Sequence, residues 1–298
     1  MDLISIEELD RAKIDEIFVL SNKFREGYKS DLPNRIVALA FFEPSTRTYS
    51  SFESAAKRLD VKVIGFRGEQ GISTSKGETF SDTIRMLDAY ADAIVVRHKY
   101  EGAAKLAAEV AKKPVINAGD GRNEHPTQAL VDFYTILEEK GKINDLNYGI
   151  VGDLKYGRTV NSFLLMLNKF SPGKVYLISP PELRARKEIL DRLNFNIEEI
   201  DELEVNINRI DVLYVIRIQK ERYLDAAEYQ KVKGSYRITK RIAENMKKDA
   251  IILHPLPRVD EIDREVDKTE NAKYFIQAQY GIPVRMSILT LILGDSYE

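Results

Sequence analysis

The alternation of short apolar runs with segments of helical periodicity constrains the fold of this chain more than any other sequence feature. From Arg35 onward, a first series predicts strands near 35–42, 61–66, 93–97 and 114–118, with helices near 46–59, 78–90 and 101–112. Strands that alternate with helices form parallel sheets whose two faces are covered by the helices. We therefore predict that the first part of the chain is a doubly wound α/β domain.

A second series of the same kind follows a long predicted helix at 126–140, which ends at Lys140 and Gly141. It predicts strands near 148–152, 174–179, 195–200, 211–217 and 250–254, with helices near 158–169, 182–193 and 237–247. A chain of 298 residues suits about two domains. The fold class we expect is therefore α/β, with two doubly wound parallel-sheet domains and the active site in the cleft between them.

The boundary between these domains is expected near 132–146, around the end of the long helix. The segment 282–293 is too apolar for a free tail, so it should pack against a core and could return to the first domain. We assign 1–132 and 280–298 to the first domain and 133–279 to the second.

Composition excludes several classes of function. The chain has no Cys, which excludes disulfides, thiol catalysis and Cys-based zinc sites, and it has only three His. A net charge of −2 gives no reason to expect nucleic-acid binding. The sequence shows no membrane-spanning run and no secretory signal. We expect a cytoplasmic protein without metal or cofactor.

Ser45, Thr46, Arg47 and Thr48 follow the first predicted strand and open the first predicted helix. The N-terminal turn of a helix carries unpaired backbone N–H groups and the positive end of the helix dipole, which suit a phosphate. In the alternative interpretation, Ser45 merely caps the helix. One hydroxyl would be enough for a cap, so three hydroxyls and an arginine favour a site for phosphate or carboxylate.

Polar residues follow other predicted strands, and ligands of parallel α/β sheets bind beyond the carboxyl ends of strands. Arg97 and His98 end the third strand, and Arg97 is predicted to be a second phosphate ligand. His125 and Gln128 open the long helix on one face, where a neutral His can donate to a carbonyl oxygen that gains negative charge. A purely structural His125 is the alternative.

The segment 152–159 nearly matches the phosphate-binding pattern G-x-x-x-x-G-K-[ST], but Arg158 stands where the pattern requires Lys. This difference argues against nucleotide binding. Arg158, next to Thr159 at a helix start, is instead predicted to grip a carboxylate with both guanidinium N–H groups.

Two further loops complete the predicted site. Arg217 and Gln219 end another strand on one side of it. His254 is followed by Pro255, Leu256 and Pro257, which form a stiff loop whose carbonyls can accept hydrogen bonds from a ligand. The polar loop 68–77 contains Ser73, Ser75 and Lys76 and suits either a mobile surface loop or a lid.

Taken in order, FFEPSTRT, VRH, GDGRNEHPTQAL, VGDLKYGRTV, RIQKER and HPLPRVDEID resemble motifs of the catalytic chains of aspartate carbamoyltransferases, in the aspartate/ornithine carbamoyltransferase family. The resemblance runs from about 35 to 285. It implies transfer of the carbamoyl group of carbamoyl phosphate to the amine of L-aspartate, the committed step of pyrimidine synthesis. It also implies a carbamoyl-phosphate-binding first domain and an aspartate-binding second domain.

The resemblance also implies roles for the site residues. Ser45, Thr46, Arg47 and Thr48 would hold the phosphate, and Thr48, Arg97 and His125 would surround the carbonyl oxygen. The amino group of carbamoyl phosphate would be bound by Gln128 and by the backbone carbonyls of Pro255 and Leu256. Pro257 is the last residue of the same loop. Arg158 with Thr159, Arg217 and Gln219 would bind the aspartate carboxylates. Lys76 and a nearby serine, Ser75 or Ser73, would enter from the neighbouring subunit of a homotrimer.

Two rival functions remain. A related carbamoyltransferase could act on another amino acid such as ornithine, but an ornithine site should show a Cys in the HPLP motif. A non-catalytic binding homologue is the second rival, and the intact charged motifs argue against it. The resemblance leaves open a regulatory chain as a further partner.

Overall fold

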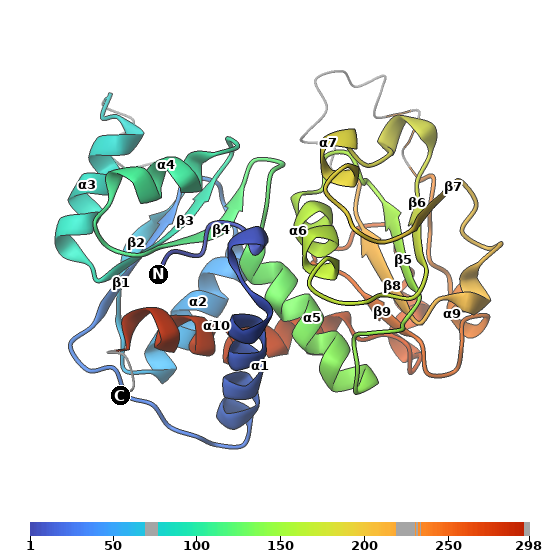
Figure 1. The fold of residues 1–298 in the computed structure, drawn as a ribbon, viewed down its shortest axis with the longest axis horizontal. Helices are drawn as coiled ribbons and strands as arrows, with labels where there is room; N and C mark the ends of the chain where they lie inside the picture. The colour runs from blue at the N-terminus through green and yellow to red at the C-terminus, as the bar shows by residue number, and fades with distance from the viewer. Residues whose placement is uncertain (69–76, 219–229, 231, 233, 295–298) are drawn as a thin grey trace. The chain divides into compact units, whose positions relative to one another are not determined.

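The computed structural model describes residues 1–68, 77–218, 230, 232 and 234–294. The chain divides into two compact units, Met1–Val131 with Tyr280–Glu298, and Asp132–Gln279 (Figure 1). Helices α5 (Pro126–Lys140) and α10 (Tyr274–Leu293) each begin in one unit and end in the other. In the described part of the chain, no helix combines the length and the hydropathy needed to cross a membrane.

The first unit contains a parallel sheet with the strand order β2-β1-β3-β4. Its strands are β1 (Ile36–Phe41), β2 (Lys62–Arg67), β3 (Ala93–His98) and β4 (Val115–Asp120). Its helices are α1 (Arg11–Arg25), α2 (Thr46–Arg58), α3 (Phe80–Tyr90) and α4 (Ala103–Val110). The structure confirms the strands and helices predicted here, with ends that differ by a few residues. Helix α1 was not predicted, because the predicted elements begin only at residue 35.

Helices cover both faces of this sheet because side chains alternate along β1. Phe41 points to one face, where its ring meets that of Tyr49 in α2 with centroids 5.1 Å apart. Ala38 and Ala40 point to the other face and share a buried cluster with Ile84 of α3 and Ala107 of α4. Helix α2 therefore packs against one face of the sheet, and α3 and α4 pack against the other.

The second unit has a parallel sheet in the order β7-β6-β5-β8-β9. The strands are β5 (Tyr148–Gly152), β6 (Val175–Ile178), β7 (Ile197–Ile200), β8 (Val212–Ile216) and β9 (Ile251–Leu253). On one face, Phe163 of α6 (Arg158–Leu167) stacks on Tyr214 at 4.4 Å. On the other, Ile242 of α9 (Lys240–Glu244) shares a cluster with Leu213 and Val215. Both units thus have the predicted layered α/β architecture.

The helix predicted at 182–193 is wrong as a continuous element. The structure has a 3₁₀ turn at Pro181–Leu183 and then the short α7 (Lys187–Leu190), with Arg184 and Arg186 extended between them. The carbonyl of Leu183 accepts the N–H of Leu154 at 3.2 Å, so a tertiary contact takes an acceptor that a continuous helix would use. The helix predicted at 237–247 is shortened to α9, because Ile238 instead forms a β-bridge with Ile262.

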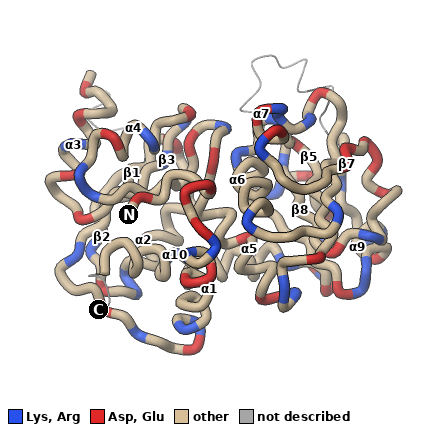
Figure 2. Tube along the Cα trace, viewed as in Figure 1, with Lys and Arg blue, Asp and Glu red and all other residues tan. Residues whose placement is uncertain are grey.

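Basic and acidic residues are interspersed along both units (Figure 2).

Candidate functional site

The strand order of each sheet reverses at one neighbouring pair of strands, and ligands of open α/β sheets bind beyond the carboxyl ends of such a pair. In the first unit this pair is β1 and β3, and in the second it is β5 and β8. Predicted site residues lie at or beyond the carboxyl ends of all four of these strands. The structure therefore presents two half-sites, one in each unit.

The turn from Ser45 to Thr48 begins the first half-site. Ser45 is the N-cap of α2, with φ −156° and ψ 105°, but its side chain makes no capping hydrogen bond. The Ser45 side chain therefore does not make the capping hydrogen bond on which the alternative interpretation depends. Thr46 and Arg47 are exposed in the first turn, while Thr48 is buried. This helix start faces solvent with a hydroxyl and a guanidinium that suit an anion.

Arg97 lies beside this turn because the parallel register pairs it with Phe41, the last residue of β1. Its Nη1 donates to the carbonyl of Ala118 at 3.1 Å, and its Nη2 lies 3.3 Å from Oε2 of Glu43. The side chain is only 13 % exposed. A largely buried guanidinium held from two sides has a fixed direction, so it can contribute a preorganised positive charge to the half-site.

His125 and Gln128 stand where the loop after β4 enters α5. His125 is buried, and its carbonyl accepts the N–H of Gln128 at 2.9 Å, which puts both residues in the same turn. The hydroxyl of Thr127 lies 3.4 Å from Nδ1 of His125. The structure thus brings the predicted His–Gln pair to the carboxyl end of β4, next to β3 in the sheet.

Two buried acids shape this loop, and the sequence analysis did not single them out. Asp120 accepts the backbone N–H of Gly102 at 2.8 Å and of Glu124 at 3.2 Å. Glu124 in turn accepts the Ser5 hydroxyl and, at 3.2 Å, the N–H of Ile6. Glu124 immediately precedes His125, so its fixed carboxylate anchors the backbone of the catalytic candidate. The sequence signal that could have identified Glu124 is its position in the motif GDGRNEHPTQAL, directly before His125.

In the second unit, glycines bring the ends of β5 and β8 close together. Gly152 has φ +119° and faces Ile216, and a Cβ on it would lie 2.0 Å from the Ile216 carbonyl oxygen. Gly157 also approaches a backbone carbonyl closely, because a Cβ on it would lie 2.6 Å from the Asp153 oxygen. Close backbone packing thus accounts for both glycines of the segment that resembles a phosphate loop.

Arg158 and Arg217 follow these two strand ends. Arg158 is the first residue of α6 and is buried, while Arg217 comes directly after β8 and is half-buried. Thr159 makes a side-chain hydrogen bond with Tyr214, so it braces the start of α6 against β8. The same buried Tyr214 donates to Asp132 at 2.7 Å, and its pKa is raised by burial and by that carboxylate. Two arginines at one switch point match a ligand with carboxylates.

The loop of Pro255, Leu256 and Pro257 follows β9 and is held by His254. The Leu256 N–H donates to Nδ1 of His254 at 2.7 Å, and Leu256 has φ +53°, an unusual conformation for a branched residue. Nε2 of His254 lies 2.7 Å from Oε1 of Glu261. Burial raises the pKa of Glu261, but the hydrogen bonds that it accepts from His254 and from the Val259 N–H lower it by more, so the net pKa is lowered. Glu261 was not predicted, although it stands in the quoted motif HPLPRVDEID.

Ser73, Ser75, Lys76 and Gln219 lie outside the described residues. In the described ranges, His, Asp and Glu side chains form no cluster of three that could hold a metal ion.

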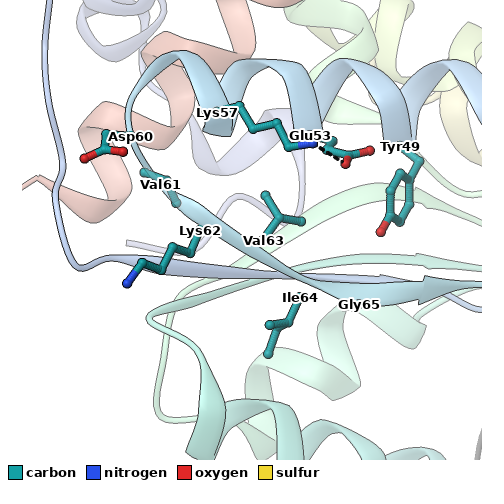
Figure 3. Close-up of a pocket in the computed structure, with 9 residues that line it drawn as sticks. All are labelled: Tyr49, Glu53, Lys57, Asp60, Val61, Lys62, Val63, Ile64 and Gly65. Atoms are coloured by element: carbon teal, nitrogen blue, oxygen red, sulfur yellow. Dashed lines mark hydrogen bonds and ion pairs between the residues drawn. The ribbon is translucent and has the colours of Figure 1, made fainter.

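A separate hollow of about 630 Å³ lies between α2 and β2 (Figure 3). Its walls include Tyr49, Glu53 and Lys57, and none of the predicted site residues. Glu53 and Lys57 are bonded to each other at 2.8 Å, and this hydrogen bond lowers the pKa of Glu53. Two charged groups of this wall are thus already paired with each other, and the predicted site residues lie at the two switch points instead.

Two family models match the chain. The carbamoyl-P binding domain of aspartate/ornithine carbamoyltransferases matches residues 1–138, and the Asp/Orn binding domain of the same family matches 144–292. The aspartate carbamoyltransferase catalytic subunit of Sulfurisphaera tokodaii is 56 % identical, over 99 % of both chains. That of Sulfolobus acidocaldarius is 55 % identical, over 98 % of this chain and 99 % of its own.

Solved structures agree in fold. The catalytic subunit of M. jannaschii aspartate transcarbamoylase superposes with a TM-score of 0.89 at 48 % identity, covering 99 % of this chain and 98 % of that one. Aspartate transcarbamoylase from Trypanosoma cruzi, solved in complex with N-(phosphonacetyl)-L-aspartic acid, gives a TM-score of 0.91 at 38 % identity, covering 97 % and 94 %.

Proposed function

The chain belongs to the aspartate/ornithine carbamoyltransferase family, and from this premise we propose that it transfers the carbamoyl group of carbamoyl phosphate to L-aspartate. The products are N-carbamoyl-L-aspartate and phosphate. The observation that carries this proposal is the pair of cationic half-sites at the two switch points. One offers Arg47 and Arg97, and the other offers Arg158 and Arg217.

The first half-site suits carbamoyl phosphate. Ser45, Thr46, Arg47 and Thr48 bind the phosphate at the start of α2, where the helix dipole favours negative charge. Thr48, Arg97 and His125 surround the carbonyl oxygen, and Gln128 binds the amino group. Attack by the amine of aspartate builds negative charge on that oxygen, and each preorganised donor lowers the barrier by about 3–4 kcal/mol.

The second half-site suits aspartate. Arg158, with Thr159 beside it, Arg217 and Gln219 bind its two carboxylates. The carbonyls of Pro255 and Leu256, in the loop closed by Pro257, accept from the amino group of carbamoyl phosphate. Holding both substrates in line contributes on the order of 7–11 kcal/mol. Accordingly, we assign carbamoyl-phosphate binding to 1–132 and 280–298, and aspartate binding to 133–279.

The proposal includes an assembly. The chain forms a homotrimer in which Lys76 and one serine, Ser75 or Ser73, of one subunit complete the site of its neighbour. A regulatory chain is an additional partner to be tested. A cytoplasmic location is in keeping with a chain that has no Cys and so forms no disulfides.

The deciding experiment is an assay of the purified chain with aspartate and ornithine in parallel, before and after exhaustive EDTA treatment. We expect release of phosphate and formation of N-carbamoyl-aspartate in both preparations. Faster transfer to ornithine, or activity lost with EDTA and restored by a metal, would contradict the proposal. The absence of Cys from the HPLP motif supports aspartate over ornithine.

A further inference from the structure

His254 and Glu261 form a buried hydrogen-bonded pair next to the loop that follows β9. His254 is 2 % exposed and Glu261 is 7 % exposed. A small hollow in the second unit is lined by Glu261 together with Gly152 and Ile216, the last residues of β5 and β8. The pair therefore lies next to the switch point, although β9 itself is the edge strand of the sheet.

The hydrogen bonds define which nitrogen of His254 carries the proton. Nδ1 accepts the N–H of Leu256 at 2.7 Å, so this nitrogen must be unprotonated. Nε2 must then carry the hydrogen, and it donates to Oε1 of Glu261 at 2.7 Å. The other oxygen of Glu261, Oε2, accepts the N–H of Val259 at 3.0 Å and of Asp260 at 3.1 Å.

The position of His254 is fixed from behind as well. Its backbone N–H donates to Oε1 of Gln277 at 2.9 Å, and Nε2 of Gln277 donates to Oδ1 of Asp132 at 2.6 Å. Gln277 is 1 % exposed and Asp132 is fully buried. A buried chain of satisfied polar groups holds its members in one arrangement, because each lost bond leaves a costly unpaired group.

The hydrogen bond between Leu256 and His254 also determines the direction of the Pro255 carbonyl. In a trans peptide the N–H and C=O of one planar unit point in opposite directions. The N–H of Leu256 is held on His254, so the C=O of Pro255 in the same peptide unit must point away from the imidazole. We propose that Glu261 is a positioning residue, which acts through the His254 tautomer to aim the Pro255 carbonyl at the amino group of carbamoyl phosphate. This inference rests on the function proposed above.

The Glu261→Gln variant tests the proposal because a carboxamide cannot accept hydrogen bonds at both ends. If its oxygen serves Val259 and Asp260, its NH₂ group faces Nε2 of His254, and the imidazole must move its proton to Nδ1. The Leu256 N–H then loses its acceptor. The Asp260→Asn variant is the matched control, because Asp260 is the exposed neighbour and contributes only its backbone N–H.

Binding is measured with two probes, phosphonoacetamide and inorganic phosphate. Phosphonoacetamide carries both an anionic group and an amide NH₂, whereas phosphate lacks the amino group. We expect Glu261→Gln to weaken phosphonoacetamide binding roughly tenfold and to leave phosphate binding within about twofold. Asp260→Asn should change neither. Equal binding of phosphonoacetamide by wild type and Glu261→Gln, or equal weakening of both probes, would overturn the proposal.

The tautomer is measured on the unmodified chain by ¹⁵N NMR of its three histidines, with the His254 signal assigned by its loss in His254→Asn. We expect the Nε2–H form at neutral pH, and a shift to Nδ1–H in Glu261→Gln. An Nδ1–H or doubly protonated His254 in the wild type refutes the proposal even if the variant fails to fold. A wild type that binds phosphate but not phosphonoacetamide would instead refute the proposed function.

Discussion

At the scale of single residues, we expect the exposed Arg47 and the half-buried Arg217 to have separable roles. Arg47 stands in the first turn of α2, where it can neutralise a leaving phosphate. We expect Arg47→Ala to lower kcat by at least about a hundredfold and to change aspartate affinity little, because leaving-group charge develops in the transition state. Steady-state kinetics check this, with Arg58→Ala at the exposed end of the same helix as the control. A kcat close to that of wild type would refute a role in phosphate binding.

Arg217 follows β8 in the second unit, so its loss should affect the other substrate. Arg217→Ala should raise the KM for aspartate roughly tenfold or more, since a charge-assisted hydrogen bond is worth about 1.5–3 kcal/mol. The KM for carbamoyl phosphate should remain nearly unchanged. Arg241→Ala is the control, because that guanidinium forms only an exposed ion pair with Glu204. A parallel fall in affinity for both substrates would show that the assignment of substrates to units is wrong.

The pKa of Glu261 gives a third prediction at this scale. Its folded-state pKa lies below its ordinary value of 4.5, because the bonds from His254 and Val259 outweigh the effect of burial. The stability gained from this depression is present above the ordinary pKa and is lost as the pH falls through the folded-state pKa. Urea unfolding from pH 7 to pH 3 should therefore show the wild type losing its advantage over Glu261→Gln. A constant difference across that range would contradict the prediction.

At the scale of elements, the amino-terminal segment acts as an extra edge of the first sheet. Leu3 forms a parallel bridge with Ile116 of β4, and Ser5 donates to Glu124 in the loop beyond that strand. We expect Ser5→Ala to lower the free energy of unfolding by about 1–2 kcal/mol, because the buried Glu124 loses a donor and the 3₁₀ turn that follows loses its cap. Denaturant unfolding measures this, and Ser50→Ala, on an exposed position of α2, should stay within about 0.5 kcal/mol of wild type.

The elements differ in how far local sequence determines them. The strands β1, β3, β5 and β8 were predicted because they are short apolar runs that are buried on both faces. Helix α5 was predicted because Lys140 followed by Gly141 is a typical helix end. The continuous helix at 182–193 failed because Leu183 bonds to Leu154, a partner distant in sequence. Periodicity contains no information about such a tertiary acceptor.

The same limit applies to the site. The sequence indicated Arg47, Arg97 and Arg158 as candidates, because each stands at a strand end or a helix start. The strand orders that make β1–β3 and β5–β8 the switch points come only from the structure. Glu124 was missed because its partner Ser5 is far away in the chain. Glu261 was missed because its role depends on which nitrogen of the His254 ring carries the proton.

At the scale of the whole molecule, the proposed homotrimer with shared sites makes a quantitative prediction. Lys76→Ala and Arg47→Ala chains should each be nearly inactive, but should regain activity when dissociated, mixed and reassembled. A site then works only if its own chain keeps Arg47 and its neighbour keeps Lys76. Random mixing makes this true for about one half times one half, or roughly a quarter, of the sites. Recovery near zero after verified subunit exchange would show that Lys76 does not serve a neighbouring chain.

The division of the chain also bears on how the protein is made. The first unit includes Tyr280–Glu298, and within it Ser287 of α10 hydrogen-bonds to Ser21 while Arg285 bonds to Ser51. A ribosome therefore releases the amino-terminal half long before the residues that complete its packing, whereas Asp132–Gln279 emerges as one uninterrupted stretch. The unit that is synthesised first therefore cannot finish folding until α10 has emerged, and a nascent chain stalled shortly before α10 would lack the contacts that Val284 and Leu289 make in the finished protein.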